Sequence, residues 1–300
     1  MTYTLGSATT SALSFTGTSG TTNITTGANT LGNVTFNGNG GTWQLNDTFT
    51  TGNAAVVTLN QGTLNTNGQT LSIGQLNSSN SNTRTLTLAN SSISINNTVA
   101  SAWQITTSTN MTLNVNSSTT ITMTGSPTAF FAGGNLTYND IVYTAGGSLN
   151  ILGTPTFRNV TISGGGAIAG VVLNSGITVT GTLTINGTSA TSRTLVSGYP
   201  LGTAQTITNN GTNSITNADF QDITGAGTAS WDLSAITGLS GDCEGNSGIT
   251  FTPSATQTWQ NANGGTWSVT ANWSSRVPLC QDDANMGVTY NASKTVYSSG

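Results

Sequence analysis

Residues that could do chemistry are few in this chain, and they gather toward its C-terminal end. Asp242, Glu244 and Asn246 alternate in a glycine-rich stretch, so oxygen donors recur at every second position. Calcium-binding loops use such spacing, because Ca²⁺ takes several carboxylate and amide oxygens from one short segment. The later bidentate glutamate of the full calcium-loop motif is absent. We therefore prefer a solvated turn and predict no metal site; these three residues are the candidate ligands for the alternative.

The chain has two cysteines, Cys243 and Cys280, which are too few for a disulfide scaffold or a zinc cluster. A disulfide between them would tie the C-terminal segment to the body before it. Such a bridge would stabilise the fold by about 3–4 kcal/mol through loop entropy. We expect two free thiols and keep the bridge as the alternative, because the sequence does not identify the redox compartment.

Paired acids are the next candidates, since glycoside hydrolysis needs two carboxylates that face one groove. Asp219 and Asp222 are the best pair, but residues three apart on a strand point to opposite faces. Asp140 stands alone between Asn139 and Ile141. Histidine, the commonest general base and metal ligand, is absent from the chain. We therefore predict no catalytic residue, no cofactor and no enzymatic activity.

Composition excludes two classes of partner. Charged residues make up 5% of the chain, against roughly 25% in a typical globular protein, and the five basic residues are scattered. Nucleic-acid binding needs clustered Lys and Arg, so we predict none. No stretch approaches the ~18 apolar residues of a membrane helix, so we predict no membrane insertion. The first residues lack the basic and apolar regions of a signal peptide, which favours release by lysis over secretion.

The elements that must position these residues are short strands. Thr, Ser, Asn and Gly dominate the polar positions and are poor helix formers. Apolar and polar residues alternate with period two in runs of four to six residues, separated by Asn-Gly, Gly-Gly and Ser-Gly turn pairs. The clearest runs are at Val34/Phe36, Val57/Leu59, Leu71/Ile73, Leu86/Leu88, Ile93/Ile95, Leu113/Val115, Ile121/Met123, Ile177/Val179 and Leu183/Ile185.

One phrase recurs along the chain, at residues 133–138 and again at 157–162, with looser copies at 31–36 and 219–224. Its asparagines, Asn135 among them, recur at multiples of about 20–24 residues, a period typical of solenoids. We interpret the phrase residues Asn33, Asn135, Asn159 and Asp222 as corners of successive coils. The prediction is an all-β fold, a parallel β-helix or β-solenoid rod followed by a small Trp-rich β module. An antiparallel sandwich or barrel is the alternative.

The same pattern divides the chain into three segments. Residues 1–30 are a lead-in or cap, because terminal repeats differ from internal ones. Residues 31–254 are the solenoid body with a loop-rich closing segment. Residues 255–300 are the Trp-rich module, or the first repeat of a further array. We expect its tryptophans to pack in a core, with stacking on sugar rings as the alternative.

Thr-x-Thr pairs at residues 85–87, 178–180 and 182–184 raise the question of an ice-binding face. Such a face needs the pair at the same corner of nearly every coil. The pairs change position along the sequence, and Asn, Ser and Gly interrupt them. We therefore expect no ice-binding face.

Residues 63–72 and 182–187, together with the Trp-rich segment that ends at 277–283, carry a family resemblance. The chain resembles repetitive β-solenoid fibre proteins of bacteriophage virions, of tail-fibre or surface-fibre type. It is also similar to autotransporter-type bacterial adhesins. The resemblance implies a non-enzymatic structural or adhesive fibre at a virion surface or outside the cell. Its implied partners are further copies of itself, often as a trimer, other virion or surface proteins, and a cell-surface glycan.

Two other functions stay open at this point. The first alternative is a secreted bacterial adhesin or surface filament protein. The second is a glycan-degrading enzyme of the tailspike class, which would require paired carboxylates in a groove on the rod.

Overall fold

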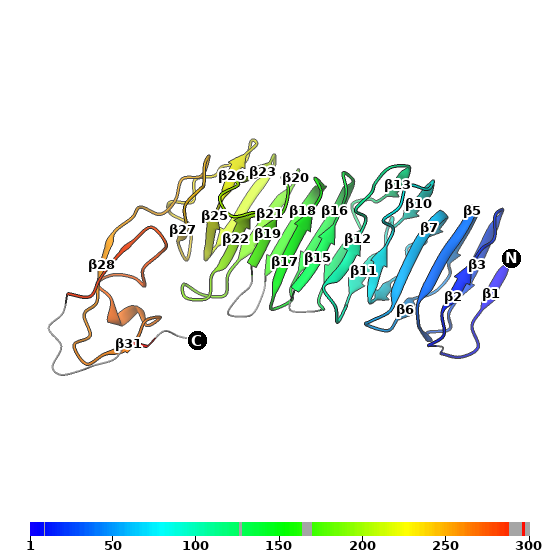
Figure 1. Ribbon diagram of the computed structural model, residues 1–300, viewed down its shortest axis with the longest axis horizontal. Helices are drawn as coiled ribbons and strands as arrows, with labels where there is room; N and C mark the ends of the chain where they lie inside the picture. The colour runs from blue at the N-terminus through cyan, green and yellow to red at the C-terminus, as the bar shows by residue number, and fades with distance from the viewer. Residues whose placement is uncertain (9, 126–127, 164–169, 288–295, 298–300) are drawn as a thin grey trace.

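The computed structural model describes residues 1–8, 10–125, 128–163, 170–287 and 296–297. The chain forms an elongated rod with a small module at its C-terminal end (Figure 1). About 51% of the residues are in strands and ~1% in helix, and the strands build a parallel β-solenoid of about 11 turns. The predicted fold class is therefore confirmed. No helix in the described residues has the length and apolarity to cross a membrane.

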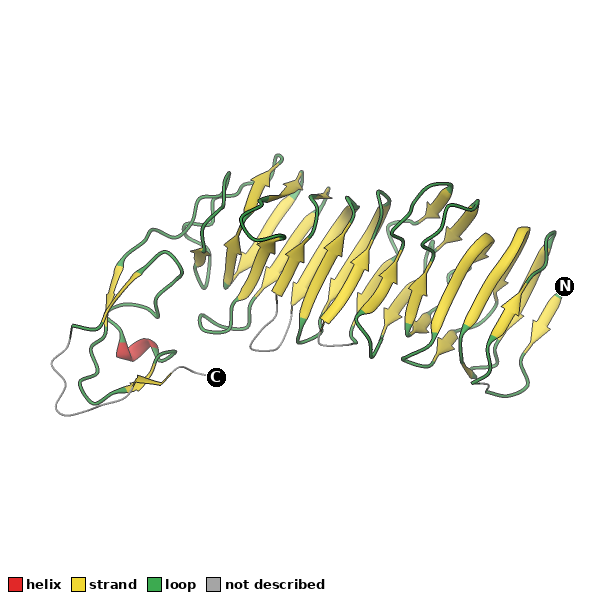
Figure 2. Cartoon of the chain, in the orientation of Figure 1, coloured by secondary structure: helices red, strands yellow, loops and turns green. Residues whose placement is uncertain are grey.

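Two long sheets run the length of the rod, and their strands pair in parallel (Figure 2). Within the described residues the first sheet has 15 strands and follows the order β1-β3-β5-β7-β9-β12-β15-β17-β19-β22-β25-β27. Its members are β1 (Thr2–Thr4), β2 (Leu13–Phe15), β3 (Thr21–Thr25), β5 (Val34–Leu45), β7 (Val56–Asn65), β9 (Gln75–Asn77), β10 (Arg84–Thr87), β12 (Ser101–Gln104), β13 (Met111–Asn114), β15 (Thr128–Ala132), β17 (Ser148–Leu152), β19 (Gly170–Leu173), β22 (Thr194–Gly198), β25 (Ala218–Gln221) and β27 (Ser240–Asp242).

The second sheet has 12 strands in the described residues. They are β4 (Thr30–Leu31), β6 (Phe49–Thr51), β8 (Leu71–Ile73), β11 (Ser92–Ile95), β14 (Thr120–Met123), β16 (Thr137–Tyr143), β18 (Thr156–Ser163), β20 (Ile177–Val179), β21 (Thr182–Asn186), β23 (Gln205–Asn209), β24 (Thr212–Thr216) and β26 (Ile223–Ala226).

The alternation read in the sequence decides which side chains enter the core. Each of the predicted alternating runs overlaps an observed strand, and its apolar members point inward. Val34, Phe36 and Val57 are fully buried in this way. Aromatic rings stack from coil to coil in the middle of the rod, where Phe131 stacks on Trp103 of the preceding coil with ring centroids 5.9 Å apart. One apolar cluster thereby extends from Ile24 to Leu233.

The coils are less regular than the sequence suggested. Thr21 faces Thr42, a step of 21 residues, but steps between paired residues range from 18 (Gln205 to Ile223) to 30 (Leu183 to Asn213). The difference from the predicted 20–24 residues arises because loops of different length leave the coil between strands.

The corner interpretation holds for three of the four phrase residues. Asn135 lies in a turn, Asp222 in a bend and Asn33 in the connection between β4 and β5, but Asn159 lies inside β18. That part of the prediction is wrong, because Asn159 supports the corner of the next coil instead. Its side-chain oxygen accepts a hydrogen bond from the backbone N–H of Thr182 at 2.7 Å, where the chain passes from β20 to β21.

Residues 1–30 begin the stack, with β1 and β2 in the first coil and β3 at the start of the second. Strand β1 pairs in parallel with β3, and Thr2 faces Asn23. Tyr3 and Phe15 pack edge to face, and Phe15 stacks on Phe36 of the next coil. Tyr3 and Phe15 are only partly buried, because no further coil covers them in the described chain.

The C-terminal module has its own small core. It contains two two-stranded sheets, β28 (Thr256–Thr258) with β30 (Asp283–Asn285) and β29 (Gly265–Thr266) with β31 (Val296–Tyr297), and the 3-10 helix η1 (Thr270–Asn272). Trp273 meets Trp259 and Trp267 edge to face, and the buried Trp259 and Trp273 form the centre of this core. These tryptophans therefore serve packing.

Candidate functional site

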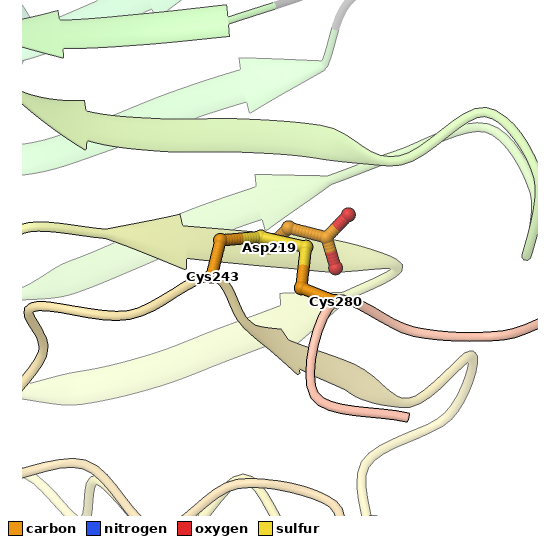
Figure 3. Close-up of side chains that lie close together, drawn as sticks. All are labelled: Asp219, Cys243 and Cys280. Atoms are coloured by element: carbon orange, nitrogen blue, oxygen red, sulfur yellow. A yellow bond between two sulfur atoms is a disulfide. The ribbon is translucent and has the colours of Figure 1, made fainter. Parts of the chain in front are cut away.

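The acidic end of the rod brings three chemically active side chains together. Cys243, just after β27, is joined by a disulfide to Cys280 of the module, and Asp219 of β25 lies beside the bridge (Figure 3). Their sulfur atoms and a carboxylate oxygen lie within 4.8 Å of one another, close enough to hold a metal ion in principle. The sulfurs are bonded to each other, however, so they offer no thiolate ligands.

The carboxylate of Asp219 is also engaged. Arg193 donates to it from Nε at 2.6 Å and donates from its other nitrogens to the carbonyls of Ala218, Gly238 and Leu239. This guanidinium ties the last two coils together. The group around Asp219 is consequently a structural junction.

The proposed calcium-loop residues lie next to the same junction. The Asp242 carboxylate accepts hydrogen bonds from the backbone N–H of Glu244 at 3.1 Å and from the side-chain amide of Asn246 at 2.8 Å. Asn246 in turn accepts from the backbone N–H of Ile223 and donates to the Phe220 carbonyl. Oxygens of Asp242 and Asn246 thus bind the protein's own amides, in a turn that anchors the closing loop to the last coil.

Asp219 and Asp222 serve separate tasks and do not form a catalytic pair. Asp219 faces Arg193, whereas Asp222 is 6% exposed, has a φ of 54° and accepts from the backbone N–H of Gly202 at 2.8 Å. Asp222 therefore holds a corner and the loop after β22.

Asp140 forms an ion pair that the sequence interpretation missed. Its carboxylate accepts from Arg158 at 3.0 and 3.1 Å and from Asn159 at 2.8 Å. Asp140 faces Asn159 in the ladder between β16 and β18, a step of 19 residues. The sequence pattern could not predict this contact, because it depends on a step that lies outside the expected 20–24 residues.

Arg84 is a second charged residue whose structural role the sequence did not predict. It is 1% exposed and donates to the carbonyls of Ser78, Asn82, Thr107 and Thr109, and to the Ser78 hydroxyl. Burial lowers the pKa of its guanidinium from the ordinary value. Arginine stays protonated in proteins, so Arg84 is a fixed charge that holds two coil loops by their carbonyls.

The outer face of the N-terminal coils carries ordered polar columns. Paired residues in β3, β5, β7, β10 and β13 form an unbroken column of threonines: Thr21, Thr42, Thr63, Thr85 and Thr112. Beside it lies a second column: Asn23, Gln44, Asn65, Thr87 and Asn114. The threonines of these coils are therefore aligned more regularly than the sequence indicated, whereas the absence of an ice-binding face stays a prediction. The spacing of the recurring phrase did not predict this column, because the number of residues per coil varies.

The second column is bonded along the rod. Gln44 donates to Asn23 at 3.4 Å, Asn65 donates to Gln44 at 3.3 Å, and Asn114 donates to Thr87 at 3.1 Å. Amide and hydroxyl groups therefore satisfy one another from coil to coil. The two columns contain no charged residue.

A hollow on the rod lies among the first coils. It has a volume of about 510 Å³, and its described lining contains no acidic side chain: Ala8, Thr10, Thr30, Leu31, Gly32, Gly52, Asn53, Ala54 and Ala55. These lining residues therefore do not form the groove with two carboxylates that a glycosidase needs.

Comparison with known protein families, with curated proteins and with solved structures found no match. The chemistry of the chain must therefore be argued from its own residues. Seven of its nine acids, all of them within the described residues, accept hydrogen bonds that hold turns, loops or ion pairs: Asp47, Asp140, Asp219, Asp222, Asp232, Asp242 and Asp282.

Proposed function

We propose that this chain is a non-enzymatic structural or adhesive fibre protein, a surface or tail-fibre component of a bacteriophage virion. The observation that carries the proposal is the single apolar core that runs through successive parallel coils from Ile24 to Leu233. Stacked coils make a stiff, elongated body, because each coil pairs with the next along the rod axis. Such a body suits projection from a surface.

The surface chemistry supports the same role. Outward columns of Thr, Asn and Gln satisfy one another and carry no charge, so the rod presents an inert polar surface. The acids that chemistry would require are engaged in turns and ion pairs. We therefore propose that the chain acts by shape and contact, with further copies of itself, other virion or surface proteins, and a cell-surface glycan as partners.

The disulfide between Cys243 and Cys280 favours a location outside the cell. Disulfides persist in oxidising surroundings, including virion and cell surfaces, and are rare in the cytosol. This observation also favours the second candidate, a secreted bacterial adhesin or surface filament protein. A glycan-degrading enzyme is the third, and the engaged acids argue against it.

Immunogold electron microscopy separates these functions. An antibody raised against the recombinant chain should label projecting fibres on purified phage particles from an induced culture. Label on cell-surface filaments, with bare particles, would replace the virion role by the adhesin role. Release of reducing ends from a panel of bacterial surface polysaccharides, absent in the matched Asp219→Asn variant, would establish an enzyme instead.

A further inference from the structure

Among the described residues, the last strand of the long sheet has one edge without a neighbouring strand. Strand β27 pairs in parallel with β25, and Cys243 donates its backbone N–H to the Phe220 carbonyl at 2.8 Å. Successive residues of a parallel strand direct their N–H and C=O groups to opposite sides. Ser240 and Asp242 therefore present these groups away from β25, where a further coil would otherwise pair.

The side chain of Gln281 occupies that position. Its Oε1 accepts from the backbone N–H of Asp242 at 2.9 Å, and its Nε2 donates to the Ser240 carbonyl at 3.1 Å. A neighbouring parallel strand would offer the same pair of groups, one C=O and one N–H. The primary amide of Gln281 thus supplies the one acceptor and one donor that a single residue of the missing coil would offer.

Further contacts complete this closure. Thr252 Oγ1 accepts from the backbone N–H of Ser240 at 3.0 Å, and Gln281 also donates to the Thr252 carbonyl at 2.8 Å. The preceding residue, Cys280, is bonded covalently to Cys243 at the end of the same strand. The Gln281 amide is consequently held at the edge by a covalent bond one residue away.

The opposite end of this sheet carries the complementary edge. Strand β1 pairs with β3 alone in the described chain, and Met1 and Leu5 make the backbone bonds to β3. Thr2 and Thr4 therefore direct their backbone groups outward. Because every strand from β1 to β27 is parallel, β1 of a second copy has the right direction to follow β27.

We propose that Gln281 is a side-chain terminator of the solenoid sheet, locked in place by the Cys243–Cys280 disulfide, and that its removal opens the β27 edge to strand β1 of a second copy. Unpaired strand edges are templates for pairing with another chain, so a terminator limits head-to-tail growth of the rod. This proposal goes beyond the proposed fibre function and does not depend on it, because Gln281 would close the β27 edge wherever the protein is located.

The lock opens by thiol–disulfide exchange. A dithiol such as dithiothreitol supplies two electrons and two protons, so Cys243 and Cys280 become thiols while the dithiol closes to its own disulfide. Gln281 then keeps its place through hydrogen bonds alone.

The test combines Gln281→Ala, Gln281→Glu and reduction, in the full chain. The carboxylate introduced by Gln281→Glu would keep the acceptor for Asp242 but lose the donor to Ser240, so Q281E should lie between wild type and Q281A. Hydrogen exchange of the Asp242 amide should quicken at least tenfold in reduced Q281A. Gln260→Ala, at an exposed module position, is the matched control. A core amide such as that of Leu59 reports whether each variant still folds.

Sedimentation velocity then identifies the occupant of the edge. Reduced Q281A should associate with rising concentration beyond the wild-type state, and Thr4→Pro in the same background should abolish this growth. Proline at Thr4 removes only an outward N–H, so pairing of β1 with β3 is kept. Unchanged exchange at Asp242 overturns the terminator. No added association, or association that survives Thr4→Pro, overturns β1 of a second copy as the occupant.

Discussion

The two ends of the described rod differ: β1 is its first strand, and β27 is its last strand before the C-terminal module (Figure 1). A side chain of the module, Gln281, bonds to β27, whereas β1 pairs with β3 alone in the described residues. The coils between β3 and β13 repeat threonines and amides in columns, so that each of these side chains has an equivalent in the neighbouring coil. The closing end instead uses single contacts: one disulfide, one glutamine and the Arg193 junction. Repetition stabilises the body, and specific chemistry is needed where repetition stops.

The largest expected effect lies in the repeated body. Phe131 is fully buried and packs against Trp103, Tyr138 and Phe157, so Phe131→Ala should lower the free energy of unfolding by about 3–5 kcal/mol. Urea unfolding followed by circular dichroism measures this. The neighbouring Phe130→Ala removes a half-buried outward ring and is the matched control. Equal losses in both variants would contradict the inward and outward assignment.

The second prediction removes the covalent contact of the closing end. Cys280→Ser should lower the stability of the oxidised protein by about 2–4 kcal/mol, because the bridge no longer restricts the unfolded chain. After reduction of both proteins by a dithiol, the difference should vanish. Calorimetry in both redox conditions checks this, and a difference that persists after reduction would assign the effect to packing of Cys280.

The third prediction concerns the ion pair within the module. Hydrogen bonds from Arg276, Leu279 and Ala255 outweigh desolvation by burial, which acts in the opposite direction, and lower the pKa of the Asp282 carboxyl. A lowered folded-state pKa stabilises the fold above the unfolded pKa of about 3.9, and this stabilisation is lost as pH falls through the folded value.

Asp282→Asn should therefore cost about 1–3 kcal/mol at neutral pH and flatten the acid dependence of stability below about pH 4. Thermal melts from pH 7 to pH 2 provide the measurement. Asp283→Asn, one residue on and exposed, is the control. Parallel pH profiles of stability for wild type and Asp282→Asn would show that the Asp282 carboxylate does not stabilise the closing end.

The smallest effect compares two ion pairs. Arg158 and Asp140 lie on the body with side-chain exposures of 43% and 23%, whereas Arg193 and Asp219 at the end are 10% and 18% exposed. Arg158→Gln should cost about 0–1 kcal/mol and less at high salt. Arg193→Gln should cost more, because three carbonyls also lose a donor. Denaturant unfolding measures both losses of stability. A larger loss for Arg158→Gln than for Arg193→Gln would contradict the proposed difference between the body and the closing end.

Much of the body could be predicted from alternation alone. Pairs such as Val34/Phe36 and Leu183/Ile185 define strands and their inward faces, because side chains alternate with period two. Register could not be predicted, since alternation says nothing about how many residues each loop consumes. The threonine column through Thr42 and Thr63 depends on that register, as does the contact between Asp140 and Arg158.

The candidate site was predictable in composition but not in use. Acids and cysteines near residue 243 marked the closing end, yet their partners lie far away in sequence. Gln281 reaches Ser240 across 41 residues, and Arg193 reaches Leu239 across 46. A lone glutamine carries no motif, so its role as a peptide substitute becomes visible only once β27 and its free edge are in place.

The disulfide also decides how the molecule would carry force. Hydrogen bonds between coils run along the rod axis, so a pull on the two ends would load them one coil at a time and peel the rod from its ends. A pull on the C-terminus would reach Cys280 and cross directly to Cys243. Residues 244–279 would form a slack loop outside the load path. Once β31 had separated from β29 and β30 from β28, tension would pass straight into the last coil.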